Sequence, residues 1–191
     1  DMLINRLCKS SGPERSHIIV QQLPSSPESF IHLDMVFTML DVDRAMVFEP
    51  LILNENQYQT VHIIIEGGKV TRIKSVNNIL SVLKKLGMDL EPVTCGGSAD
   101  EWNQEREQWH SGANFFAFAP GKVMSYARNI HTLNEMQKSG FDIITAREVI
   151  SGKKDLGNYK RCVVTIDGSE LPRGGGGARC MTMPLRRESI L

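Results

Sequence analysis

The sequence has no long apolar run and no net charge. No uninterrupted apolar stretch approaches the roughly 20 residues that a helix needs to span a bilayer, and residues 1–16 lack the apolar centre of a signal peptide. Lysine plus arginine equals aspartate plus glutamate, at 22 each, so no net field attracts nucleic acid or an anionic membrane. We therefore expect neither partner, and we expect a cytoplasmic protein.

The sequence also lacks paired cysteines. Its four cysteines, Cys8, Cys95, Cys162 and Cys180, are too scattered for a CxxC zinc site or a disulfide framework. We expect free thiols and no bound metal. What the chain does have is length: 191 residues, 41% of them hydrophobic, suffice for one globular domain with a sizeable core.

Strand-like and helix-like segments alternate irregularly along the chain. Apolar runs with period-two patterns or β-branched residues predict strands over 16–23, 31–41, 44–50, 60–73 with a Gly67–Gly68 turn, 89–95, 112–129 with a Pro120–Gly121 turn, 141–145 and 162–167. Helical spacing predicts helices over 77–87, over 98–110 with a Ser98–Glu101 capping box, over 131–140, and briefly after 146. Hairpins between many strands favour a mixed α/β arrangement over a purely parallel sheet.

Cys180 is the first candidate for chemistry. It follows four glycines and Arg179, where cationic charge and backbone N–H groups favour the reactive thiolate. The alternative is a small buried hydrophobe, which is the commoner role of a free cysteine. The four glycines either form a linker or let the backbone approach a ligand, and the apolar tail over 181–185, which we expect to pack on the core, favours the second.

His32 and Asp34 are the second candidate. On a strand they share one face, and a histidine beside a carboxylate can act as a general acid and base while the carboxylate holds a cation. An edge-strand surface pair is the alternative. The helix segment EREQW, 105–109, is predicted to be a solvated face.

Three blocks carry a family resemblance: IHLDMVFTMLD (31–41), EREQWHSGANFFAFAPGKVMSYARN (105–129) and SELPRGGGGARCMTMPL (169–185). In this order they closely resemble the C-terminal half of arginine deiminases, and the resemblance covers nearly the whole chain. It implies a partial five-bladed α/β propeller, the pentein fold, made of mixed ββαβ-type modules. It also implies that residues 1–191 are the C-terminal part of a single catalytic domain whose upstream blades are absent from this chain.

The resemblance implies the conversion of L-arginine to L-citrulline and ammonia through a covalent amidino-cysteine. Cys180 matches the nucleophile, His32 the general acid and base, and Asp34 a carboxylate that holds the guanidinium. Asn114 and Gly174 match positions that contact the α-amino end of the substrate, with Gly174 acting through its carbonyl. No metal or organic cofactor is implied, since cysteine supplies the nucleophile and histidine the protons.

The chain departs from the family pattern in two ways. Gly175 stands where relatives commonly have an arginine that approaches the substrate carboxylate. The second guanidinium-binding aspartate, the glutamate that supports the histidine and the carboxylate-binding arginines precede the HLD block in the family, and none is present here. We therefore expect two open sheet edges and about half of the guanidinium clamp, completed by a complementary chain segment or a second copy.

Two alternatives remain open at this point. The chain could belong to another guanidine-modifying enzyme, an amidinotransferase or a methylarginine hydrolase, for which Gly175 is the first clue. It could also be a non-catalytic pentein-like binding module. A module that had lost catalysis would rarely keep all four candidate residues, His32, Asp34, Asn114 and Cys180, which argues against this alternative.

Overall fold

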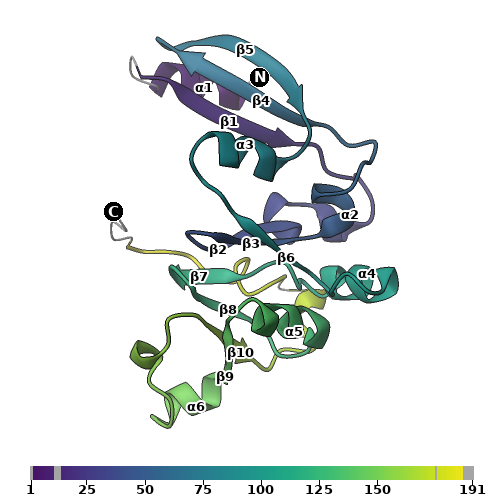
Figure 1. Ribbon diagram of the computed structural model, residues 1–191, viewed down its shortest axis with the longest axis vertical. Helices are drawn as coiled ribbons and strands as arrows, with labels where there is room; N and C mark the ends of the chain where they lie inside the picture. Colours follow the sequence, from purple (N-terminus) through teal and green to yellow (C-terminus); the bar gives the residue numbers. More distant parts are fainter. Residues whose placement is uncertain (1, 11–13, 175, 187–191) are drawn as a thin grey trace.

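In the part of the chain that the structure describes, three β-sheets follow one another along the long axis of the molecule (Figure 1). The structure is a computed structural model and describes residues 2–10, 14–174 and 176–186. The strand orders are β1-β4-β5, β2-β3-β6 and β7-β8-β10-β9. The strands are β1 (Ser16–Gln21), β2 (Phe37–Asp41), β3 (Arg44–Val47), β4 (Thr60–Glu66), β5 (Lys69–Val76), β6 (Glu91–Thr94), β7 (Phe116–Ala119), β8 (Lys122–Tyr126), β9 (Asp142–Thr145) and β10 (Cys162–Ile166). The mixed α/β prediction is confirmed, and the five-bladed propeller stays a prediction.

The first sheet is an antiparallel meander. β4 pairs with β1 on one side and with β5 on the other. The predicted β4–β5 turn is confirmed, and both of its residues, Gly67 and Gly68, have positive φ of 55° and 73°. Left-handed backbone at two successive positions is what a tight hairpin needs and what glycine adopts without strain.

The second and third sheets each combine an antiparallel hairpin with a parallel crossover. β2 pairs antiparallel with β3, and β3 pairs parallel with β6. In the third sheet β7 and β8 are antiparallel, whereas β10 runs parallel to both β8 and β9. Parallel neighbours need long connections, which here contain helices. The strand predicted over 44–50 ends at Val47, because Pro50 at the start of α2 begins a helix instead.

The helices that the structure describes are α1 (Met2–Ser10), η1 (Glu28–Phe30), η2 (Leu33–Met35), α2 (Glu49–Ile52), α3 (Ile79–Lys85), α4 (Glu101–Trp109), α5 (Ile130–Lys138), α6 (Ala146–Ile150), η3 (Leu156–Asn158) and η4 (Leu171–Arg173). Side-chain caps begin four of the described helices, namely α3, α4, α6 and η3. Asn78 caps α3 and Gly87 follows its end with φ 93°, which agrees with the helix predicted over 77–87. The Ser98 cap is wrong: Asp100 caps α4, because its Oδ1 accepts a hydrogen bond from Trp102 N at 3.0 Å.

Two apolar clusters hold the layers together. One joins the second and third sheets through side chains that include Met46, Phe115 and Val163. The other packs the second sheet against α2 and α3 through Val47, Ile52 and neighbours. Full burial of one Leu, Val or Phe side chain contributes about 1.5–3 kcal/mol, so these clusters dominate the stability of the fold.

Arg161 adds a polar connection between the second and third sheets. Its Nε lies 2.7 Å from Asp41 Oδ2 and its Nη2 lies 2.5 Å from Asp43 Oδ1. The Arg161 and Asp41 side chains are only 15% and 9% exposed, so this pair is largely shielded from water. Removal of one partner would leave the other charge buried without compensation.

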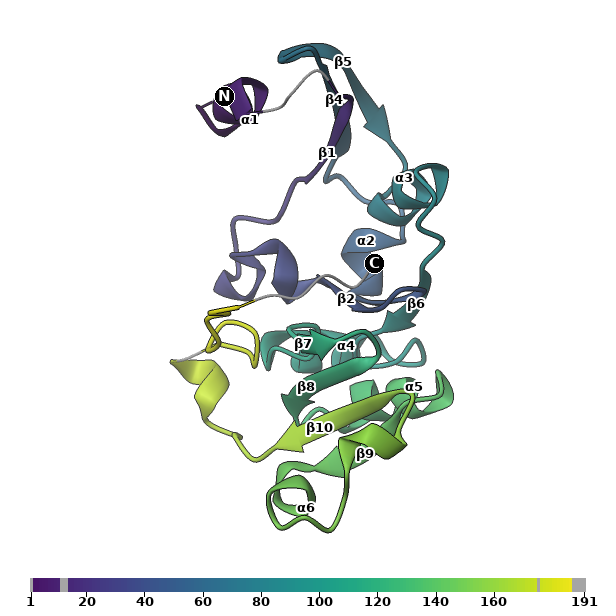
Figure 2. The ribbon, with the colours of Figure 1, turned by 90° about the vertical axis from the view of Figure 1, so that its left-hand side faces the viewer.

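The C-terminal segment crosses between the second and third sheets, next to the η1–η2 segment and β7 (Figure 2). The prediction that its apolar residues pack on the core is wrong. Met181, Met183 and Leu185 are 44%, 77% and 87% exposed, and no strand forms there. The segment instead buries its smallest residues, Gly177 and Ala178, which leaves the larger ones outside.

Among the helices that the structure describes, none has the length and apolar character to cross a membrane. Over the same residues, no group of three or more His, Cys, Asp or Glu side chains is arranged to hold a metal ion.

Candidate active site

Exposure distinguishes Cys180 from the other cysteines. All four are free thiols, and Cys180 is exposed, whereas Cys95 and Cys162 are buried. Burial raises the pKa of Cys95 to about 12, with a smaller opposing effect from the Thr132 hydroxyl, and burial also raises the pKa of Cys162. Burial therefore disfavours the reactive thiolate at both positions. The role of Cys180 as a buried hydrophobe, the alternative considered from sequence, does not fit this structure.

Two of the glycines before Cys180 are required by their neighbours in the protein. Gly176 has φ 77°, and a Cβ there would lie 2.9 Å from Cys180 Cβ. At Gly177 a Cβ would lie 2.2 Å from Asn114 Oδ1 and 2.4 Å from Asn114 Cβ. Real Cβ atoms do not approach so closely, so glycine lets the loop pack tightly over Asn114 and turn at the thiol. Gly175 lies outside the described residues, so its consequence stays a prediction.

Asn114 connects the Cys180 loop to the Asp34 segment. Its side chain is fully buried; Oδ1 accepts hydrogen bonds from Arg179 N at 3.1 Å and Cys180 N at 3.2 Å. Its Nδ2 donates to the main-chain oxygen of Asp34 at 3.1 Å. One amide group thus links the main chain of Cys180 to the main chain of Asp34, although the two residues are far apart in sequence. Contact of Asn114 with a substrate stays a prediction.

The segment that carries His32 and Asp34 is not a strand, which corrects the prediction for 31–36. His32 is extended, with φ −135° and ψ 152°, and a 3₁₀ turn, η2, follows from Leu33 to Met35. The strand begins only at Phe37. The main-chain oxygens of Asp34 and Met35 accept side-chain hydrogen bonds from Asn114 and Gln108. Those acceptors are therefore engaged by distant side chains rather than by a neighbouring strand, which the period-two pattern could not reveal.

The carboxylate of Asp34 has one engaged and one unengaged oxygen. Oδ2 lies 3.5 Å from Arg179 Nε, in an ion pair whose side chains are 25% and 49% exposed. Oδ1 is buried and, among the described residues, accepts no hydrogen bond. A buried acceptor without a donor costs about 1–3 kcal/mol. Asp34 therefore offers a place for a further N–H donor, beside a guanidinium that the protein supplies itself.

His32 precedes Asp34 by two residues and has an exposed side chain. Its main-chain oxygen accepts a hydrogen bond from Met35 N at 3.1 Å, which closes the η2 turn. Among the residues that the structure describes, its imidazole accepts or donates no hydrogen bond. The imidazole is accordingly open to solvent on the segment that Asn114 joins to Cys180.

Tyr126 binds the main chain of the Cys180 loop. It is 1% exposed, and its Oη donates a hydrogen bond to Gly176 O at 2.7 Å. Burial raises the pKa of Tyr126, and the electrostatic effect of the nearby Cys180 side chain raises it further. Gly174, by contrast, is exposed, and a Cβ there would meet no atom within 4 Å. Its carbonyl contact with substrate stays a prediction.

The sequence did not reveal the role of the second half of α4. The prediction of a solvated face for 105–109 is wrong for Glu107 and Gln108, which are each 1% exposed, whereas the other three residues of that range are exposed. Glu107 accepts hydrogen bonds from His131 N, Thr132 N and the Thr132 hydroxyl, at 2.7–2.9 Å, and so holds the first turn of α5. The only signal was that this charged stretch belongs to the second block of the family resemblance.

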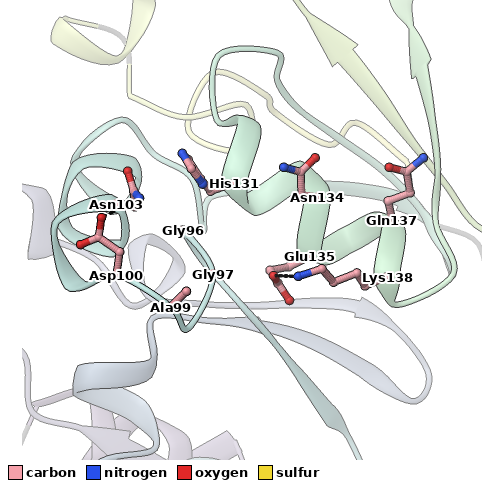
Figure 3. A pocket seen from close by; sticks show the side chains of 10 residues that line it. All are labelled: Gly96, Gly97, Ala99, Asp100, Asn103, His131, Asn134, Glu135, Gln137 and Lys138. Carbon is pink, nitrogen blue, oxygen red and sulfur yellow. Dashed lines mark hydrogen bonds and ion pairs between the residues drawn. The ribbon is translucent and has the colours of Figure 1, made fainter.

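A hollow of about 470 Å³ lies elsewhere, where the turn after β6 meets α4 and α5 (Figure 3). Polar side chains such as Asp100, His131 and Glu135 surround it, and an ion pair of 2.6 Å joins Glu135 to Lys138 within it. None of the predicted site residues borders this hollow. The candidate site is the junction of the Cys180 loop, Asn114 and the η2 segment.

An exposed thiol, a carboxylate with a free oxygen and a histidine on a mixed α/β frame define a candidate thiol-nucleophile site. The chain belongs to the arginine deiminase family, whose family model matches residues 1–187. It is 35% identical over 183 residues to an arginine deiminase of Mycoplasma capricolum subsp. capricolum, covering 94% of this chain and 39% of that relative. The chain is also 34% identical to an arginine deiminase of Oenococcus oeni, in a match that covers 94% of this chain and 39% of that relative. It is 33% identical to an arginine deiminase of Listeria welshimeri, in a match that covers 98% of this chain and 42% of that relative. The chain thus spans well under half the length of these curated relatives.

Proposed function

We propose that this chain carries the nucleophile of an enzyme that hydrolyses L-arginine to L-citrulline and ammonia. Membership in the arginine deiminase family supports this reaction class. The observation that carries the proposal is the Asn114 link, which holds Cys180 N next to Asp34 while Asp34 Oδ1 remains without a donor. The proposal includes residues 1–191 as the C-terminal part of a catalytic domain that further polypeptide completes.

In the proposed reaction, Asp34 holds the guanidinium of the substrate by charge-assisted hydrogen bonds. Such bonds contribute about 1.5–3 kcal/mol each, more than the exposed Arg179 ion pair, which is worth about 0–1 kcal/mol. A guanidinium that enters can therefore replace Arg179 or use the free Oδ1.

The chemistry then needs two steps. The Cys180 thiolate forms a bond to the guanidinium carbon, and the electron pair of one C–N double bond moves to nitrogen. His32 gives a proton to the departing nitrogen, so ammonia leaves and an amidino-cysteine remains. His32 next takes a proton from water as the oxygen attacks the same carbon, and cleavage of the C–S bond releases citrulline and the thiolate. Arginine and water thus become citrulline and ammonia.

Citrulline formation by the full-length polypeptide tests this function. We expect wild-type activity with L-arginine, no measurable activity for Cys180→Ser, and at least a hundredfold loss of kcat/KM for Asp34→Asn, roughly the effect of lost positioning at a reacting centre. Cys8→Ser is the matched control, since Cys8 is also a free thiol outside the site. Citrulline production that survives in Cys180→Ser would contradict the proposal.

A further inference from the structure

The side-chain amide of Gln108 contacts the chain on both sides of His32 and Asp34. Gln108 lies in the last turn of α4, and its Nε2 donates to Ser29 O at 2.7 Å and to Met35 O at 3.2 Å. Ser29 precedes His32 by three residues, and Met35 directly follows Asp34. A single buried group therefore holds both ends of the short segment that carries these two side chains.

The geometry of this contact is restrictive. A glutamine amide has two N–H groups in one plane, and both are used here on main-chain oxygens, so the spacing of the two oxygens follows from the amide itself. Ser29 and Met35 are 9% and 6% exposed, so little water is at hand to replace the donor. If the amide is lost, the two carbonyl groups lose their common anchor, and the segment is free to shift.

Gln108 and Asn114 are six residues apart, where α4 leads into β7. Asn114 holds the Cys180 loop through Oδ1 and the Asp34 carbonyl through Nδ2. Gln108 binds the main-chain oxygen of Met35, the next residue of the same segment. The corner between α4 and β7 thus contacts both the thiol loop and the histidine–carboxylate segment.

We propose that Gln108 is a positioning residue, which sets His32 and Asp34 at their working distance from Cys180. It touches no substrate in this scheme and acts only through the main chain of the η1–η2 segment. The inference rests on the proposed function, because it assumes that Asp34 presents a cation to the Cys180 thiolate. A misplacement of about 1 Å at such a site reduces the rate on the order of a hundredfold.

The same helix offers a matched control. Gln104 lies one turn earlier and is 4% exposed, and its Nε2 donates to Glu49 Oε2 at 3.0 Å. The variants Gln108→Met and Gln104→Met both replace a buried amide in α4 with an apolar side chain of similar length. They differ in that Gln104 has no hydrogen bond to the η1–η2 segment.

The test compares two alkylating reagents on the full-length polypeptide, with the label on Cys180 followed by peptide mass spectrometry. Chloroacetamidine carries a guanidinium-like cation beside its reactive carbon, whereas iodoacetamide is neutral; in each case the sulfur–carbon bond forms as halide leaves. The rate ratio of the two reagents, divided by the ratio for free cysteine, reports how well Asp34 aligns a cation with the thiol. This readout needs no turnover.

For the wild type and for Gln104→Met we expect this normalised ratio to be well above one. The values of the two proteins should agree within about twofold. For Gln108→Met we expect the ratio to fall at least about tenfold at an unchanged iodoacetamide rate, with a similar fall in kcat for citrulline formation. If Gln108→Met does not fold, Gln108→Asn, which is one methylene shorter, takes its place and should give a partial fall.

Other outcomes separate the inference from the proposed function. A high wild-type ratio that falls in Gln108→Met, without any citrulline from arginine, would support positioning and contradict the deiminase function. Equal ratios for Gln108→Met and Gln104→Met would overturn the inference, even if citrulline forms. A wild-type ratio no higher than that of free cysteine would overturn it as well. Failure of both Gln108 variants to fold, while Gln104→Met folds, would assign Gln108 to stability alone.

Discussion

Addition of one methyl group at Gly177 should disrupt the site, because no space exists for it. A Cβ there would lie 2.2 Å from Asn114 Oδ1, 2.4 Å from its Cβ and 2.5 Å from its Cγ. Asn114 is fully buried and its Cβ is fixed to the backbone, so a rotamer change does not relieve the contact. Gly177 is not among the glycines with positive φ, so the effect is one of packing rather than of backbone conformation.

The expected cost follows from two contributions. Overpacking of a well-packed region costs about 1–3 kcal/mol. Displacement of Asn114 also weakens its hydrogen bonds to Asp34, Arg179 and Cys180, each worth about 0.5–1.5 kcal/mol. We expect Gly177→Ala to lower the free energy of unfolding by about 3 kcal/mol, and so to lower Tm by roughly 6–12 °C in a domain of this size.

Gly174→Ala is the control in the same loop. A Cβ at Gly174 meets nothing within 4 Å, and φ is −136°, so alanine fits. We expect its Tm within about 2 °C of wild type, since surface changes of this kind are worth about 0.5 kcal/mol. Urea and thermal unfolding of both variants, with Cys180 alkylation rates, form the assay. Equal stability of Gly177→Ala and Gly174→Ala would refute the packing that we describe around Asn114.

Three further predictions concern the frame of the site. Tyr126→Phe removes the donor to Gly176 O and should lower the free energy of unfolding in urea by about 1 kcal/mol. Tyr58→Phe is the control and should leave this free energy almost unchanged, because the Tyr58 hydroxyl accepts a hydrogen bond from the exposed Gln57 side chain. Equal losses in the two variants would contradict the support we assign to Tyr126. Arg161→Ala should lower the free energy of unfolding by about 3 kcal/mol, because Asp41 then stays buried without its partner. The exposed Arg147–Asp167 pair provides the control, and the free energy of unfolding of Arg147→Ala should lie within about 0.5 kcal/mol of wild type. Burial, with help from the charges of His17 and Lys74, lowers the pKa of His62 below 6.5, so the unfolded chain takes up the proton first and stability should fall as the pH drops through 6.5. Tm measured at pH 8 and pH 5.5 should therefore decrease less for His62→Gln than for the wild type, and equal decreases would contradict this reading.

Local sequence signals predicted most of the frame correctly. The β4–β5 hairpin and the helix α3 follow from short-range patterns of apolar residues and glycines. These elements satisfy their own backbone groups nearby, so the sequence around them contains the information. The Asp100 cap shows the usual limit of such predictions, because two candidate caps, Ser98 and Asp100, lie only two residues apart.

Local patterns failed where distant side chains bind the main chain. The alternation over 31–41 resembles a strand, but Gln108 and Asn114 bind the carbonyl groups of Met35 and Asp34, and a 3₁₀ turn forms there instead. Glu107 and Gln108, in the charged stretch before β7, are likewise buried by contacts with distant residues. Such contacts join positions more than seventy residues apart, so no window of sequence around His32 contains the cause. The family resemblance identified the blocks, and only the fold shows how they hold one another.

The account depends most on Cys180 as the atom that bonds to the guanidinium carbon. The direct measurement is mass spectrometry of the full-length polypeptide, quenched with acid during turnover of L-arginine and digested to the peptide that contains Cys180. We predict an amidino group on Cys180 in the wild type and none in Cys180→Ser, with the modified fraction rising and then decaying as arginine is consumed. Citrulline production with Cys180 unmodified at every time point, or with the amidino group on Cys8, would contradict the account.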